Sequence, residues 1–147
     1  EAAEQMLWGV KNADIVKISE EEIRLLLNET PEEGARRLVE KFHVKLALVT
    51  LGDKGVFFAS KNASGLVFAF RDLKPVDATG AGDIFAGSAI TRILQSGKAP
   101  EGLTCEELTE ICRFANAAAG ISVTRSGGIP SIPESAEVEA YLTKQQG

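Results

Sequence analysis

Two apolar segments of strand length, separated by sequence of helical period, constrain the fold of this chain most strongly. The segments are ADIVKIS at residues 13–19 and VKLALVT at residues 44–50. Between them, apolar residues recur at helical spacing, first around Ile23 and again after Pro31, which is typical of helices that bury one face. A strand, a helical crossover and a second strand form a parallel pair. The sequence therefore predicts an α/β fold.

The rest of the chain changes its hydrophobic period several more times. It contains two strand-like segments, GVFFAS and GLVFAF, then helices at about 82–96 and 104–123, and a short last helix around Tyr141. The turn-prone residues 61–64 between the two strand-like segments predict an antiparallel hairpin. Two parallel strands are too few for a doubly wound domain, so we expect an incomplete sheet.

Composition and charge narrow the classes of function. The 147 residues are 44% hydrophobic and 25% charged, which is typical of a globular domain with its own core. The net charge of −5 disfavours a general binder of nucleic acids or acidic membranes, because both need clustered Lys and Arg. No apolar run approaches the roughly 18 residues of a membrane span. We therefore predict neither a nucleic-acid partner nor a membrane partner.

The cysteines indicate the cellular compartment of the protein, and the first residues indicate whether the chain is a fragment. Cys105 and Cys112 lie seven positions apart in one predicted helix, too far apart along its axis to pair, and we expect both to be buried. With the single histidine, His43, they fall short of a structural zinc set, and we expect His43 to end a surface helix. The cytoplasm is the compartment this predicts. The chain begins at Glu1, inside an apparent helix, so we expect a fragment of a longer protein.

A glycine-rich turn, KPVDATGAGDIFAG at residues 74–87, leads directly into a helix. The first N–H groups of a helix lack intrahelical acceptors, and the helix dipole adds about half a positive charge there. Gly80, Ala81 and Gly82, together with those amides, could therefore cradle an oxyanion. Asp83 would repel that anion, but in phosphoryl transfer it could take the proton of an attacking hydroxyl.

A structural interpretation of the same turn stays open on these residues alone. Asp83 can be a first-turn acid favoured by the dipole, with the glycines forming a tight turn. Two other phosphate-binding loops do not fit: no GxxxxGK string followed by Ser or Thr occurs, and Phe85 stands where a dinucleotide fingerprint needs its third glycine.

Four segments, in order, resemble one family. VDATGAGDIFAG resembles the second signature, approximately D-T-T-G-A-G-D-x-F, of the ribokinase-like (PfkB) carbohydrate kinases. NADIVKISEEEI resembles the segment ending in N-x-x-E, VTLGDKGVFF the T-L-G-x-x-G nucleotide segment, and FANAAAGISVTRSGGIPSIP the C-terminal adenine and cation loop. The resemblance covers about residues 13–133. It implies the C-terminal part of a Rossmann-like, three-layer ribokinase-type fold.

The resemblance assigns roles to the matching positions. Asp83 matches the base that deprotonates the sugar hydroxyl, and the amides from Gly80 through Ala81 and Gly82 to Asp83 match the anion hole for the γ-phosphoryl group. The nucleotide contacts are implied for Thr50, Gly52, Gly55 and Asn116. A simple hairpin approach and an ordinary polar residue on an Ala-rich helix are the structural alternatives for these nucleotide positions.

The resemblance also implies cations beside the phosphates. Magnesium accompanies ATP, with Glu22 acting on it through water, although Ser19 replaces the usual Asn and makes Ser19-x-x-Glu22 a capping box as well. Ser19 is implied near the nucleotide. A monovalent cation, usually potassium and not used by all members, is implied at Asp77, Thr79, Ser122, Arg125, Gly127 and Ser131; an Asx turn is the alternative for Asp77. For Lys17 a place near the nucleotide stays open, but we expect a solvated charge at a strand end.

The resemblance implies an ATP-dependent sugar kinase, and Ser19 favours a fructokinase because fructokinase-like members often carry serine there. Ribose, a keto-deoxy sugar acid or a nucleoside is the alternative acceptor, and a non-catalytic sugar- or nucleotide-binding member is the alternative function. The N-terminal half of such kinases, with most sugar contacts and the lid through which homodimers form, has no counterpart in these residues. We therefore expect the chain alone to be inactive.

Overall fold

The computed structural model describes residues 14–73, 80–124 and 133–146, and within them the strands form one mixed sheet. In sheet order the strands are β1 (Ile15–Ser19), β2 (Leu46–Thr50), β3 (Gly55–Ser60) and β4 (Ser64–Phe68). β1 and β2 pair in parallel, whereas β3 is antiparallel to both β2 and β4. The predicted parallel pair and the predicted hairpin are confirmed.

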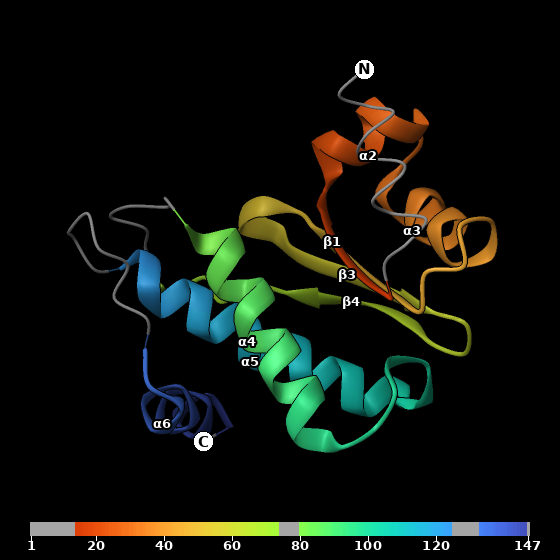
Figure 1. Cartoon of the computed structure of the whole chain (residues 1–147). Coiled ribbons are helices and arrows are strands. Elements are labelled where there is room, and N and C mark those ends of the chain that lie inside the picture. The colour runs from red at the N-terminus through yellow and green to blue at the C-terminus, as the bar shows by residue number, and fades with distance from the viewer. Residues whose placement is uncertain (1–13, 74–79, 125–132, 147) are drawn as a thin grey trace.

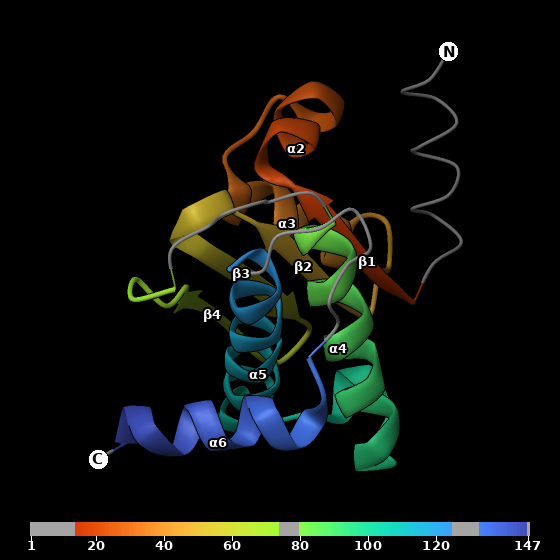
Figure 2. The ribbon, with the colours of Figure 1, turned by 90° about the vertical axis from the view of Figure 1, so that its left-hand side faces the viewer.

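Helices cover both faces of the sheet, so the chain has three layers (Figures 1 and 2). The helices are α2 (Glu20–Leu27), α3 (Pro31–Glu40), α4 (Ala81–Ser96), α5 (Cys105–Val123) and α6 (Ser135–Gln146), with single 3₁₀ turns at Gly52–Lys54 and Pro100–Gly102. α2 and α3 form the crossover between β1 and β2 on one face, and α4 and α5 pack on the other. α6 packs on α5, where Val138 shares a core cluster with Phe114, and Glu139 of α6 pairs with Arg92 of α4. The predicted α/β, three-layer fold is confirmed.

The alternation of side chains along β2 explains why both faces need a helical layer. Leu46 and Leu48 face the α4–α5 layer, while Ala47 and Val49 face the α2–α3 layer, and all four are buried. A strand that is apolar on both faces is stable only inside such a sandwich. In the residues that the structure describes, no helix is both long enough and apolar enough to cross a membrane.

The two cysteines occupy different environments, and both are free. Cys112 is buried in the core under the sheet, as predicted. Cys105 is exposed, so the expectation of burial is wrong there. It is the first residue of α5, immediately after the capping Thr104, and a helix start at the surface leaves its first side chain in solvent.

The two thiols are therefore expected to differ in reactivity. Burial raises the pKa of Cys112 to about 12, so almost none of it is thiolate at neutral pH, and the thiolate is the reactive form. We expect iodoacetamide at pH 8 to modify one thiol, Cys105, in the native chain and both thiols in denaturant, counted by mass spectrometry. Cys105→Ser is the control and is expected to remove all native labelling; rapid native modification of Cys112 would contradict the buried position.

Candidate active site

The segments that the sequence marked as functional meet at one end of the sheet. The turn after β2, the N-terminus of α4 and the C-terminal half of α5 lie together there, on the left in Figure 1 and toward the viewer in Figure 2. They enclose a hollow of about 380 Å³, the first hollow. Its lining includes Thr50, Gly52, Gly55, Phe70, Leu73, Ala81, Gly82, Asn116 and Gly120. Residues predicted to bind the nucleotide and residues predicted to form the anion hole therefore line the same hollow.

The turn between β2 and β3 owes its shape to two glycines. Gly52 has a φ of 63° and Gly55 a φ of 122°, both in the region that favours glycine. A Cβ on Gly55 would lie 2.0 Å from the carbonyl oxygen of Val67 on β4, whereas a Cβ on Gly52 would meet nothing within 4 Å. The turn closes through a 2.8 Å bond from the Leu51 N–H to the Gly55 carbonyl. The glycine spacing thus brings the backbone of the turn against the hairpin and leaves it open to the first hollow.

Asn116 anchors the hairpin and also lines the first hollow. Its side chain is buried and Nδ2 donates to the carbonyls of Val67, at 3.2 Å, and Phe68, at 3.3 Å. Through these bonds Asn116 joins α5 to the end of β4, which is a structural role for this residue. A contact with adenine stays a prediction.

The N-terminus of α4 lacks the side-chain cap that other helices in the structure have. Ser19, Thr30 and Thr104 accept the N–H of the third residue of α2, α3 and α5, at 3.1, 3.3 and 3.1 Å. α4 begins instead at Gly80, in the left-handed region at φ 80° and without a side-chain cap bond. Its first bond in the helix runs from the Ile84 N–H to the Gly80 carbonyl. The preceding amides of the turn therefore have no acceptor in the helix.

Asp83 lies on the first turn of α4 with its side chain exposed. It borders a second hollow, of about 470 Å³, which Gly80, Phe114 and Val138 also line. Ala81 and Gly82 line the first hollow and Asp83 does not. Asp83 thus borders the second hollow, whereas Ala81 and Gly82 of the same turn border the first. An anion held by the amides in the first hollow would therefore be less strongly repelled by the Asp83 carboxylate.

Lys17 lies beside this turn. Its Nζ is 3.2 Å from the position that a Cβ on Gly82 would take. The side chain is exposed, as expected of a strand-end lysine. Its place on β1, which is parallel to β2, the strand that leads into the β2–β3 turn, was the signal for a role at the site.

The remaining predicted positions fall into two groups. Ser19 and Glu22 form a complete capping box: the Glu22 N–H donates to Ser19 Oγ at 3.1 Å, and the Ser19 N–H donates to Glu22 Oε2 at 2.9 Å. Their structural role is thus visible, and Ser122 is a buried residue of α5. The other predicted cation positions lie outside the described residues: Asp77, Thr79, Arg125, Gly127 and Ser131.

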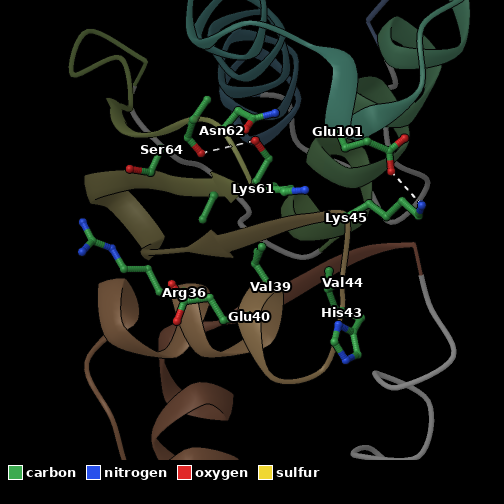
Figure 3. A pocket seen from close by; sticks show the side chains of 13 residues that line it. Arg36, Val39, Glu40, His43, Val44, Lys45, Lys61, Asn62, Ser64 and Glu101 are labelled. Carbon is green, nitrogen blue, oxygen red and sulfur yellow. Dashed lines mark hydrogen bonds and ion pairs between the residues drawn. The ribbon is translucent and has the colours of Figure 1, made fainter.

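A third and larger hollow, of about 980 Å³, lies at the opposite end of β2 and β3 (Figure 3). Lys61 from the hairpin turn and His43, which follows α3, line it, and Lys45 pairs there with Glu101 at 2.8 Å. Of the predicted site residues that the structure describes, none lines this hollow. His43 is exposed and lies three residues beyond the end of α3, close to the predicted end of a surface helix.

The profile of the pfkB family carbohydrate kinases matches residues 1–135. The chain belongs to this family. It is 40% identical to fructokinase-1 of Zea mays over 146 residues, which are 98% of this chain and 44% of that protein. The pfkB chain therefore spans less than half the length of this relative.

Solved structures of pfkB-type kinases share its fold. The fructokinase of Xylella fastidiosa with bound ATP superimposes with a TM-score of 0.88 at 27% identity, covering all of this chain and 48% of that one. The fructokinase of Vibrio cholerae O395, bound to fructose, ADP and a calcium ion, gives 0.82 at 30% identity, covering 95% and 44%. The predicted ribokinase-type fold is thus confirmed.

Proposed function

We propose that this chain is the C-terminal nucleotide-binding and phosphoryl-transfer part of an ATP-dependent sugar kinase, with fructose as the leading acceptor. The observation that carries the proposal is the uncapped start of α4, whose Gly82 borders the first hollow and lies beside Lys17. The fructose- and ATP-bound fructokinases with the same fold support the choice of ligands.

The electrostatics of the turn favour a phosphate group. Open amides at a helix N-terminus carry partial positive charge, and the Lys17 ammonium adds a full charge beside them. An anion bound between these two positive features would be attracted by both and would offset their mutual repulsion. A triphosphate that enters the first hollow from the β2–β3 turn would supply that anion at Gly82.

Asp83 is the residue that we assign to the acceptor hydroxyl. Its carboxylate is on the same helical turn as the open amides but outside the first hollow. A base in this place can take the proton of a hydroxyl that approaches a phosphoryl group held by the amides. The rest of a complete kinase would have to hold the sugar, because the reacting atoms need to be held in near-attack geometry.

The cations belong to the same proposal. Magnesium is commonly held by one or two carboxylates plus substrate phosphates, and Glu22 is the carboxylate that the family resemblance offers, with its Oε2 already accepting the Ser19 N–H. Magnesium would neutralise charge on the transferring phosphoryl group. Potassium at the predicted cation positions, a homodimer and a cytoplasmic location stay predictions.

ADP release by the full-length gene product, with magnesium and potassium, tests the proposed function. The panel is fructose, ribose, keto-deoxygluconate, adenosine and no acceptor, and we expect fructose to give the highest kcat/KM. The 147-residue chain, run beside it, is expected to show negligible turnover because it spans 44% of the maize enzyme. Turnover with another acceptor would replace fructose, and ATP binding without turnover on any acceptor would favour the non-catalytic alternative.

A further inference from the structure

The segment between β4 and the glycine-rich turn, residues 69–73, is held in place by α5 and α6. Tyr141 of α6 donates its hydroxyl to Asp72 Oδ1 at 2.5 Å. The Tyr141 ring meets the Phe70 ring edge to face, with centroids 5.1 Å apart and planes at 85°. One side chain of α6 thus contacts both Phe70 and Asp72, although Tyr141 follows Asp72 by 69 positions in sequence.

α5 holds the same segment through two more contacts and also fixes the residues just before it. The Arg113 guanidinium lies 4.8 Å from the centre of the Phe70 ring, an attractive cation–π arrangement. Leu73 packs so closely on α5 that a Cβ on Gly120 would be 2.6 Å from Leu73 Cδ1. Asn116 fixes the carbonyls of Val67 and Phe68 just before the segment. The segment is therefore packed against α5.

The held segment is also part of the first hollow. Phe70 and Leu73 line it, facing Asn116 and Gly120 of α5 and Gly82 of the glycine turn. Tyr141 and Asp72 do not line it. From this arrangement we propose that Tyr141 and Asp72 are positioning residues for the nucleotide, acting through Phe70 and Leu73 on the width of the hollow.

The bond between Tyr141 and Asp72 suits this task. A hydroxyl that donates to a carboxylate makes a charge-assisted bond, roughly twice as strong as a neutral one. Burial, and to a smaller extent the hydrogen bond to Asp72, raises the pKa of Tyr141. The hydroxyl therefore keeps its proton at neutral pH. The inference rests on the proposed function, because it assumes that the first hollow takes the nucleotide.

The test is Tyr141→Phe in the full-length gene product, since it removes the hydroxyl and keeps the ring on Phe70. We expect the KM for ATP and the Kd of ATP by calorimetry to rise about three- to tenfold, as for the loss of one charge-assisted hydrogen bond. The KM for the sugar and kcat are expected to stay within about twofold. Backbone amides in 69–73 are expected to exchange hydrogen faster, with or without ATP.

Matched variants separate positioning from general stability. Thr143→Val removes another hydroxyl bond of α6, from Oγ1 to the Glu139 carbonyl at 2.9 Å, without touching 69–73, and is expected to leave all readouts unchanged. Asp72→Asn keeps an oxygen that can accept the Tyr141 hydroxyl and loses only the charge, so it should weaken ATP binding less than Tyr141→Phe does. The double variant, Tyr141→Phe with Asp72→Asn, should weaken ATP binding no more than Tyr141→Phe alone, because the two residues act through one bond.

The measurements distinguish a failure of the positioning role from a failure of the proposed function. If the wild type binds ATP and Tyr141→Phe binds it equally well, the positioning role is wrong and the proposed function stands. If ATP affinity and sugar affinity fall together, α6 is merely structural and the positioning role is again wrong. If the wild type binds no ATP, the proposed function and the positioning role are both overturned.

Discussion

Asp83→Asn in the full-length gene product is expected to lower kcat at least a hundredfold while the Kd for ATP changes little. General-base catalysis is typically worth about a hundredfold to ten-thousandfold, or roughly 3 to 5 kcal/mol of barrier. The amide keeps the size of the side chain but cannot accept the proton. ATP binding is expected to survive because Asp83 borders the second hollow, whereas Gly82 and the β2–β3 turn border the first.

The competing interpretation of Asp83 as a first-turn acid has its own control. Glu33 is the third residue of α3, as Asp83 is of α4, and lies away from both hollows. A dipole contribution is worth about 0.3 to 1 kcal/mol of stability at either helix, so both variants should lose a similar small amount of it. Glu33→Gln is expected to keep full turnover. Turnover of Asp83→Asn within fivefold of the wild type would refute the base assignment.

The fold could be predicted from the sequence where local and periodic signals agree. β1, β2 and the hairpin follow from short apolar runs and turn residues, and the capped helix starts at Ser19, Thr30 and Thr104 follow from hydroxyl residues placed three before an acid. The N-cap position of α4 is Gly80, which has no side chain to act as a cap, and this too can be read from the sequence.

The contacts that finish the site could not be predicted in this way. Lys17 approaches Gly82, and Tyr141 approaches Asp72, only because the sheet and the helical layers bring distant segments together. Neither residue type nor spacing encodes such pairs. Cys105 was missed for a related reason, since the general tendency of free cysteine to be buried takes no account of its place in the exposed first turn of α5. Hydrophobic periodicity predicts which face of a helix or strand is buried, whereas this site is formed by the ends of helices and strands and by the turns between them.

Gly55→Ala is expected to damage both stability and nucleotide binding. The φ of 122° lies in a region that costs other residues about 1 to 3 kcal/mol. The added methyl group would also lie 2.0 Å from the Val67 carbonyl and 2.9 Å from the Phe68 Cα, so β3 and β4 must separate at a point where Gly55 pairs with Phe68. We expect the free energy of unfolding, from urea denaturation of the 147-residue chain, to fall by about 3 kcal/mol or more.

Gly52→Ala is the matched control for this variant, because it adds the same methyl group to the same turn. Gly52 has a positive φ of 63°, but a Cβ there would meet nothing within 4 Å, so only the left-handed backbone is penalised, by about 1 to 2 kcal/mol. The difference between the two variants therefore measures the close approach of the turn to β4. Equal losses for Gly52→Ala and Gly55→Ala would mean that the turn can move away from β4. The first hollow would then be wider and less rigid than the contacts of Gly55 imply, and the Kd for ATP should also be the same for the two variants.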